Sequence, residues 1–323
     1  MSKPNIYVTR PDIPKEALDK LKHFCNVTHW DQERPVDRAV LLENVKGKDA
    51  LLCMLTDNID KEVITAGEHV PRAASGKVMA SEIQLTAALC RHDLPKGCTL
   101  HVPRASTHFA LLLQVSRVPS YTRTLLLEGE WLYSWGPMWL CGQGLHNSVV
   151  GFVGMGRIAQ SVLKRCLGLD IKKAIYYDKF HPIKPAEDMG AVFAPLEDVI
   201  SQSDFIITLV NLSEETRGMF NKALFLKMKR TAVFVNTSRG GVVNQDDLYE
   251  ALKNNVIRAA AIDVSLPEPL PKDHKLLTLR NLIVTPHIGS SEVSVRIEMG
   301  LLAADNVINA VLGKPTRTKP VNA

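Results

Sequence analysis

Short apolar runs alternate with amphipathic segments along much of the chain, and this alternation predicts strands that are separated by helices. In the N-terminal third, strands are expected at residues 6–9, 27–30 and 50–55, with a helix at residues 14–24 between the first two. The first and third of these strands are almost continuously apolar, which is typical of strands covered on both faces. Strands that alternate with helices indicate an α/β fold with a parallel sheet.

The same alternation is most regular in the second half of the chain. Strands are predicted at residues 149–153, 174–177, 205–209, 232–236, 259–263 and 282–284, and helices at residues 157–167, 196–202, 221–228 and 245–254. About six parallel strands with helices between them predict a second, doubly wound domain. Further helices are expected at residues 107–128 and 291–312, whereas residues 67–106 show no clear period.

Composition narrows the classes of protein that fit this pattern. The 323 residues carry 39 Lys and Arg against 34 Asp and Glu, a formal net charge of +5, and 46% of them are hydrophobic. The chain is too apolar to be disordered, has no apolar run of the ~18 residues that a membrane span needs, and has no basic stripe for nucleic acid. Its six cysteines form no CxxC pair, which favours free thiols in a reducing compartment. We therefore expect a cytoplasmic protein with no nucleic-acid partner, no membrane partner and no metal site.

A glycine-rich loop lies between a predicted strand and a predicted helix. Gly154, Gly156 and Ala159 fit the pattern G-x-G-x-x-G/A, in which the glycines allow a tight turn and a close approach of a pyrophosphate to the helix N-terminus. Asp178 ends the next predicted strand, where a carboxylate binds ribose hydroxyls and repels a 2′-phosphate, which favours NAD. Lys179 beside it would attract that phosphate. The alternative is a glycine turn with another ligand, or with none.

Three polar residues follow strands of the second domain, at the edge where open α/β sheets bind ligands. Arg239 can bind a carboxylate through two parallel hydrogen bonds, and His287 can deliver a proton near neutral pH. A carboxylate such as Glu268 beside the histidine would fix its tautomer and favour the imidazolium form. Taken singly, each has a plainer interpretation as a surface ion pair, an exposed turn or the cap of a strand. Together, downstream of a nucleotide loop, they indicate hydride transfer to a keto acid.

These motifs resemble the D-isomer-specific 2-hydroxyacid dehydrogenases, and within that family the glyoxylate/hydroxypyruvate reductase branch. The matching segments are residues 135–142, 151–160, 235–248, 261–271 and 285–290, within a near-continuous match from about residue 129 to 315. Residues 5–65 resemble the N-terminal segment of the family less specifically.

The resemblance implies a role for each matching position. His287 would be the acid/base, paired with Glu268, and Arg239 would bind the carboxylate and carbonyl of the substrate. The cofactor, NAD(H) or NADP(H), would be bound by Gly154, Gly156, Arg157, Ile158, Asp178, Lys179, Asn211, Thr237, Asp263 and Gly289. The substrate would be bound by Leu55, Val78, Met79, Trp135, Arg239 and His287.

Family members bind the substrate carboxylate with a V-G-x-D-like loop, which is replaced here by the segment containing Val78 and Met79. Trp135 would reach the active site of a partner subunit, although plain packing in an interface explains this residue equally well.

The resemblance also implies an organisation of two doubly wound α/β domains. A Rossmann coenzyme domain at residues 116–290 would be inserted into a flavodoxin-like substrate domain made of residues 1–115 and 291–323. The protein would be a homodimer that acts on a small 2-keto or 2-hydroxy acid. We expect NAD(P)H-dependent reduction of glyoxylate or hydroxypyruvate to glycolate or D-glycerate. The alternatives are a dimeric NAD-binding module with little catalysis, similar to a corepressor, and another dehydrogenase of the family such as one for phosphoglycerate.

Overall fold

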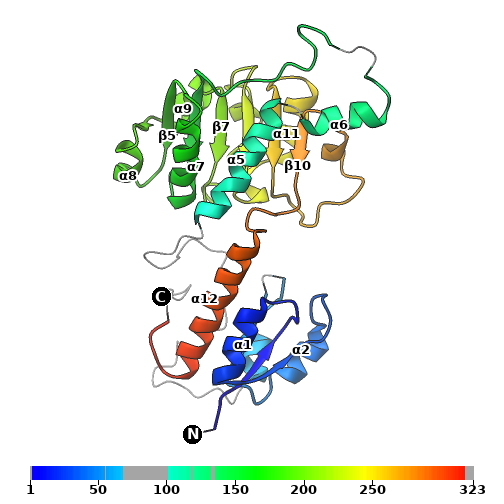
Figure 1. Cartoon of the computed structure of the whole chain (residues 1–323), viewed down its shortest axis with the longest axis vertical. Coiled ribbons are helices and arrows are strands. Elements are labelled where there is room, and N and C mark those ends of the chain that lie inside the picture. Colours follow the sequence, from blue (N-terminus) through cyan, green and yellow to red (C-terminus); the bar gives the residue numbers. More distant parts are fainter. Residues whose placement is uncertain (1, 55, 68–100, 118, 132–134, 317–323) are drawn as a thin grey trace. The chain divides into compact units, whose positions relative to one another are not determined.

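The computed structural model describes residues 2–54, 56–67, 101–117, 119–131 and 135–316 of the chain. Within them the chain forms two compact units (Figure 1). The central unit is continuous, His101–Ser290, and the terminal unit combines Met1–Leu100 with Ser291–Ala323. The central unit is therefore an insertion in the terminal one. Its first residue is His101 and not residue 116 as the sequence suggested, because helix α5 (His101–Arg117) packs along helix α7 (Arg157–Leu167) of the central unit.

The terminal unit contains a parallel sheet of order β2-β1-β3, as in the first three strands of a flavodoxin-like sheet. Its elements are β1 (Asn5–Val8), α1 (Lys15–Phe24), β2 (Asn26–His29), α2 (Arg38–Asn44), β3 (Ala50–Leu52), α3 (Lys61–Ala66) and α12 (Val293–Val311). Side chains of β1 alternate between two cores, because Ile6 and Val8 contact the α1 and α12 side while Tyr7 faces the α2 and α3 side. Gly300 allows α12 to approach α1, since a Cβ there would lie 3.1 Å from Ala17.

The central unit contains seven parallel strands in the order β10-β9-β8-β7-β4-β5-β6. The strands are β4 (Val149–Val153), β5 (Lys173–Tyr177), β6 (Val192–Phe193), β7 (Phe205–Thr208), β8 (Val233–Asn236), β9 (Ala259–Ile262) and β10 (Leu282–Val284). The helices are α5, α6 (Pro119–Leu127), α7, α8 (Lys184–Glu187), α9 (Leu196–Gln202), α10 (Lys222–Phe225) and α11 (Gln245–Lys253), with 3-10 turns at Gly240–Val242 and Lys275–Thr278. This strand order is that of a Rossmann sheet with one added strand at the β10 edge.

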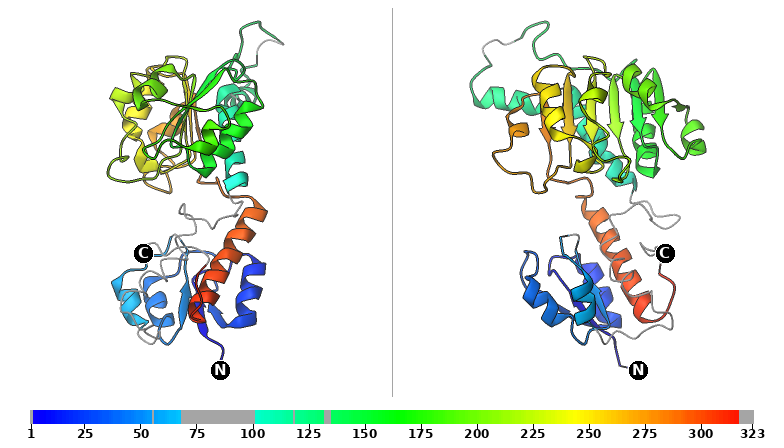
Figure 2. Two further views of the ribbon diagram at one scale, coloured as in Figure 1. Left: turned by 90° about the vertical axis from the view of Figure 1, so that its left-hand side faces the viewer. Right: turned by 180° about the vertical axis from the view of Figure 1, so that it is seen from behind.

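Helices cover both faces of this sheet, as Figure 2 shows. Phe152 and Val235 point to the face covered by α5 and α7, whereas Ile206 and Phe234 point to the face covered by α9, α10 and α11. Burial on both faces explains why these strands are continuous apolar runs rather than alternating ones. The predicted α/β class with parallel sheets is confirmed.

Two details differ from the sequence prediction. The helix expected over residues 107–128 is two helices, α5 and α6, and the second begins at Pro119. Proline lacks the amide donor that a continuous helix needs, so a break is expected where the ring enters the first turn. The sheet also has a short edge strand, β6, that is too brief to show a period in the sequence. Among the described residues, no helix is long and apolar enough to cross a membrane.

Candidate active site

The strand order places β4 at the switch point of the central sheet, between β5 and β7. The connections from the two sides of β4 run in opposite directions, which leaves a crevice at the carboxyl ends of the strands. The glycine-rich loop, Gly154 to Gly156, leaves the carboxyl end of β4 and leads into α7. The chain thus presents this loop where open α/β sheets bind ligands.

The conformation of the loop explains both glycines. Gly154 has a φ of +91°, and a Cβ there would lie 2.8 Å from the Leu209 carbonyl oxygen, so both backbone and space exclude a side chain. Gly156 is the N-cap of α7 and offers no side-chain cap, and a Cβ there would meet nothing within 4 Å. The first glycine is needed by the fold itself, whereas the second leaves open space at the N-terminus of the helix.

Helix α7 packs closely on the sheet behind this loop. Ala159 is fully buried and Ile158 packs against the same core. Arg157 is the first residue of the helix. A small residue at position 159 brings the positive end of the helix dipole close to the strand ends, where a pyrophosphate would be bound.

Asp178 follows β5 and braces the glycine loop. Its Oδ2 accepts a hydrogen bond from the Met155 amide at 2.8 Å, and its Oδ1 accepts one from the Phe180 amide at 2.9 Å. A carboxylate has about four acceptor positions, so ribose hydroxyls can still donate to it. Lys179 pairs with Glu215, with 2.8 Å between Nζ and Oε2.

Arg239 lies in the loop after β8, and that loop is fixed by its own residues. Asn236 accepts hydrogen bonds from the Ser238 amide at 3.0 Å and from its hydroxyl at 2.8 Å, and donates to the Arg239 carbonyl at 3.1 Å. Gly240 follows, and a Cβ there would overlap the Ser265 carbonyl. The arginine loop and the loop after β9 are therefore in direct backbone contact.

Glu268 and His287 form a pair on neighbouring loops, after β9 and after β10. The His287 Nδ1 lies 3.0 Å from Glu268 Oε2, and both side chains are partly exposed. The other carboxylate oxygen, Oε1, accepts the Ser265 amide at 2.9 Å. Gln245 of α11 braces the same turn, because it donates to the Leu266 carbonyl and accepts from the Leu266 amide. The histidine is therefore bound through Nδ1, which leaves Nε2 to face a substrate.

Asp263, which is buried, fixes the segment that carries His287. Its Oδ1 accepts from the Thr285 hydroxyl and from the Ile288 amide, and its Oδ2 accepts from the Gly289 amide at 2.8 Å. His287 itself has a φ of +53°, in the left-handed region. A residue other than glycine stays in this region where its surroundings hold it there, and the bonds on both sides of His287 provide that restraint.

The remaining cofactor candidates lie along the same edge of the sheet. Thr237 directly follows β8, and its hydroxyl is buried without a hydrogen-bond partner, which suits a ligand that brings a polar group. Asn211 is exposed after β7, and its carbonyl accepts the Thr216 hydroxyl. The glycine loop, the open space at Gly156 and this unpaired hydroxyl together fit a dinucleotide.

The structure thus brings most of the predicted site residues to one edge of the central sheet. Among the predicted substrate contacts, Leu55, Val78 and Met79 lie outside the described residues. Trp135 is described and 76% exposed. Sequence reasoning missed the residues that hold the site, namely Asn236, Gln245, Ser265 and Thr285. The only indication of these four residues in the sequence is that each is polar and lies close to the end of a strand or the start of a helix.

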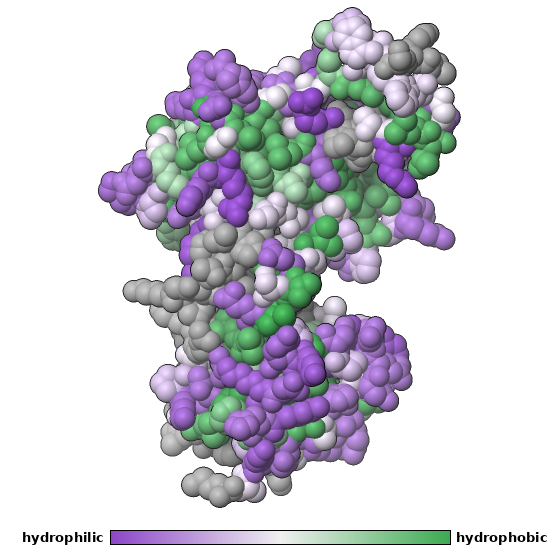
Figure 3. Space-filling model, in the orientation of Figure 1, coloured by the Kyte–Doolittle hydropathy of each residue, from purple (hydrophilic) through white to green (hydrophobic). Residues whose placement is uncertain are grey.

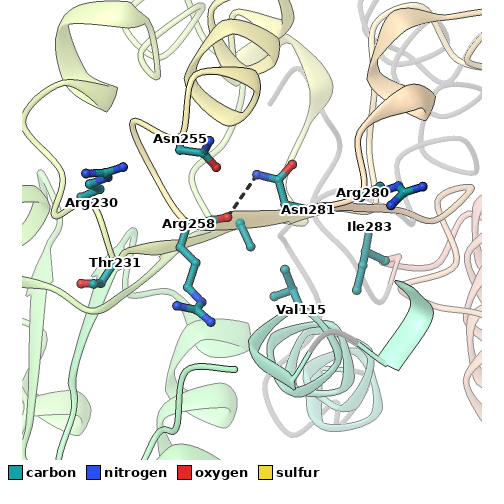
Figure 4. A pocket seen from close by; sticks show the side chains of 9 residues that line it. Val115, Arg230, Thr231, Asn255, Arg258, Arg280, Asn281 and Ile283 are labelled. Carbon is teal, nitrogen blue, oxygen red and sulfur yellow. Dashed lines mark hydrogen bonds between the residues drawn. The ribbon is translucent and has the colours of Figure 1, made fainter. Parts of the chain in front are cut away.

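Two of the hollows among the described residues lie away from this edge of the sheet. One, of about 470 Å³, lies at the amino ends of β8, β9 and β10, the opposite edge of the sheet from the glycine loop (Figure 4). Two of its arginines already have partners, because Arg258 donates to the Cys141 carbonyl and Arg280 lies 3.8 Å from Glu128. The other, of about 910 Å³, lies in the terminal unit between α1, the end of β3 and α12. Among the described residues, no predicted site residue lines either hollow, and the larger one is lined by Met54 and Thr56, the neighbours of Leu55 in the sequence.

Comparison with known proteins identifies the family to which this architecture belongs. Residues 109–289 match the model of the D-isomer specific 2-hydroxyacid dehydrogenase, NAD binding domain. The glyoxylate reductase/hydroxypyruvate reductase of Homo sapiens is 38% identical over 316 residues, 96% of this chain and 95% of that protein. The glyoxylate reductase of Korarchaeum cryptofilum is 36% identical over 308 residues, 95% of this chain and 92% of its own length.

A solved structure has the same fold over nearly the whole chain. The crystal structure of the TT0316 protein from Thermus thermophilus has a TM-score of 0.82 and 30% sequence identity, and the comparison covers 98% of this chain and 99% of that one. The family match covers more than half of the chain, and the human relative matches nearly all of it. This chain therefore belongs to the D-isomer specific 2-hydroxyacid dehydrogenase family, and its central unit contains the NAD-binding domain of that family.

Proposed function

We propose that the protein reduces glyoxylate or hydroxypyruvate to glycolate or D-glycerate with NADH or NADPH as the hydride donor. The names of the relatives support this substrate class, because those of human and archaeal origin are glyoxylate reductases. The observation that carries the proposal is the His287–Glu268 pair, 3.0 Å apart, on the loops after β10 and β9, next to the loop after β8 that carries Arg239. An acid/base and a carboxylate-binding cation at one edge of the sheet are what reduction of a 2-keto acid requires.

Each residue has a distinct task in this proposal. The guanidinium of Arg239 binds the substrate carboxylate and polarises the keto oxygen. His287, protonated and held through Nδ1 by Glu268, donates the proton on Nε2 to that oxygen. The bound nicotinamide supplies a hydride to the keto carbon, so one hydride and one proton convert the carbonyl to an alcohol. His287 is then neutral and regains its proton from solvent.

The cofactor would be held by residues already described. Gly154, Gly156, Arg157 and Ile158 would receive the pyrophosphate at the start of α7, and Asp178 would accept the adenosine ribose hydroxyls. Asn211, Thr237, Asp263 and Gly289 would line the rest of the crevice, with Asp263 at the nicotinamide carboxamide. Asp263 already accepts three protein donors, so its larger task in this proposal is to hold the His287 segment.

We also propose that the protein is a cytoplasmic homodimer. Several large apolar side chains are exposed on the segment that follows α5, and Figure 3 shows hydrophobic residues over α6. They are Leu126, Leu127, Trp131, Trp135, Met138 and Trp139. An apolar surface of this kind is typical of a protein interface, and tryptophan is enriched in such surfaces. Cys25, Cys53, Cys141 and Cys166 are free thiols, which suits a reducing compartment.

The test is initial-rate NADH and NADPH oxidation with glyoxylate, hydroxypyruvate and phosphohydroxypyruvate as alternative substrates. The proposal expects turnover of the two small acids and weaker turnover of the phosphorylated acid, in keeping with the names of the relatives. Arg239→Ala should abolish most of this activity and leave nucleotide binding in place. Nucleotide binding without oxidation by any acid, unchanged by Arg239→Ala, would instead support a binding module.

A further inference from the structure

Lys179 and Glu215 form an ion pair across the carboxyl edge of the central sheet. Lys179 follows β5 and Glu215 lies in the loop after β7, and these are the two strands that flank β4. The Nζ and Oε2 atoms are 2.8 Å apart. The pair therefore connects the two sides of the crevice into which the glycine loop opens.

This pair contributes little to folding. The side chains are 57% and 70% exposed, and ion pairs with such exposure are worth little in water because salt and solvent screen them. Each group favours the charged form of the other, since the hydrogen bond to Glu215 raises the pKa of Lys179 and the same bond lowers the pKa of Glu215. Both are therefore charged at neutral pH. We expect these two charges to influence the affinity for a charged ligand bound beside them more than they influence stability.

The charges around Lys179 determine how it meets a 2′-phosphate. Lys179 pairs with Glu215 and follows Asp178 directly in the sequence, so two carboxylates accompany this one lysine, whose ammonium also lies 5.3 Å from the centre of the Phe180 ring. The neighbouring Glu214 is paired separately, with Arg217, at 3.2 Å. A 2′-phosphate carries a charge of about −1.5 to −2 at pH 7, so it would compete with Glu215 for the lysine and be repelled by both carboxylates.

We propose that Glu215 is a specificity-determining residue that disfavours NADP(H), because it pairs with Lys179, the cation next to Asp178 in the sequence, and adds a negative charge beside the proposed adenosine ribose site. This inference rests on the proposed dinucleotide site. It assigns the preference for NAD(H) to a residue on the loop after β7, in addition to the acidic residue after β5. Removal of this carboxylate frees Lys179 to bind a 2′-phosphate.

The test compares Glu215→Gln with the matched control Glu214→Gln. The control removes the same charge from the adjacent residue, which is exposed and pairs with Arg217 instead of Lys179. Binding of NADPH and of NADH is measured by nucleotide fluorescence at low and at physiological ionic strength, independently of turnover. Glu215→Gln should tighten NADPH binding about 5-fold and change NADH binding less than about 2-fold, in keeping with a single exposed charge pair. Higher salt should reduce the gain, and Glu214→Gln should show none.

A double variant separates the mechanism from a general charge effect. Lys179→Ala combined with Glu215→Gln should lose the gain in NADPH binding, because the lysine is the group that Glu215 occupies. An unchanged ratio of NADPH to NADH affinity in Glu215→Gln, with NADH still bound, would overturn this inference alone. Failure of the wild-type protein to bind either nucleotide would overturn the proposed function and this inference with it.

Discussion

One carboxylate oxygen of Glu268 lies 3.0 Å from Nδ1 of His287, and the other accepts a hydrogen bond from the Ser265 amide at 2.9 Å. The orientation of the histidine is therefore set by the turn after β9, a different loop from its own. This arrangement fixes which ring nitrogen faces the crevice. The same carboxylate also connects the loop after β9 to the loop after β10. We therefore expect both its charge and its two acceptor oxygens to be needed for activity.

Replacement of Glu268 by Gln tests this connection between the two loops. Glutamine has one acceptor oxygen, whereas His287 Nδ1 and the Ser265 amide both need one, so one of the two donors would face the NH2 group. The imidazolium also loses its negative partner. We expect kcat to fall roughly 10- to 100-fold and the pH profile of kcat to change shape, with a smaller effect on nucleotide affinity. An unaltered pH profile would contradict the assignment of the pair as acid/base.

Asp263→Asn tests how the His287 segment is held. The asparagine oxygen cannot serve the Thr285 hydroxyl and the two backbone amides, so a buried donor is left unpaired at a cost of about 1–3 kcal/mol in stability. The left-handed conformation of His287 should relax. We expect a lower melting temperature together with a fall in kcat. Thr285→Val is the control, because it removes one of the donors and leaves both amide bonds, so it should be affected less.

The two glycines of the loop should respond differently to alanine. Gly154→Ala places a Cβ against the Leu209 carbonyl at a φ of +91°, so it should destabilise the fold by about 1–3 kcal/mol and weaken nucleotide binding. Gly156→Ala meets nothing within 4 Å, so stability should be nearly unchanged while the added methyl group obstructs the pyrophosphate. Denaturant unfolding and NADH binding measure the two effects separately. Equal loss of stability in both variants would contradict this division of roles.

Cys166 gives a prediction about pH. Burial raises the pKa of this thiol to about 12 from an ordinary value of 9.0. A group whose pKa is raised in the folded state stabilises the fold below its unfolded pKa, and that contribution is lost as the pH rises toward the folded value. Above pH 9 the free energy of unfolding should therefore fall by roughly 1 kcal/mol per pH unit on account of this group.

Denaturant unfolding between pH 8 and pH 11 measures this slope. Cys166→Ala should be less stable at neutral pH but show a shallower decline at high pH, whereas the exposed Cys141 replaced by Ala should keep the wild-type slope. Identical slopes for the wild type and Cys166→Ala would show that the thiol is not shielded as the structure indicates.

Local pattern was sufficient to predict six of the seven strands of the central sheet and the glycine loop. Strands such as β4 and β8 are buried on both faces, so their apolar runs identify them, and each catalytic candidate lies in the loop after a strand. Gly154 was predictable as well, because only glycine fits the turn that the motif requires.

Contacts between distant segments were not predictable in the same way. The partners of Asp263 lie more than twenty positions along the chain and depend on the pairing of β9 with β10. Gln245 reaches the Glu268 turn only because α11 starts beside it. The pair of Lys179 with Glu215 depends on which strands flank β4, and strand order is not contained in periodicity.

The most direct test of the central claim is a comparison of wild type with His287→Asn in hydroxypyruvate reduction, with NADH binding measured on the same samples. If His287 is the proton donor held by Glu268, the variant should bind NADH normally, and its rate of NADH oxidation should fall on the order of 10²- to 10⁴-fold. Equal rates in the two proteins, or NADH binding without any oxidation by the wild type, would contradict the account.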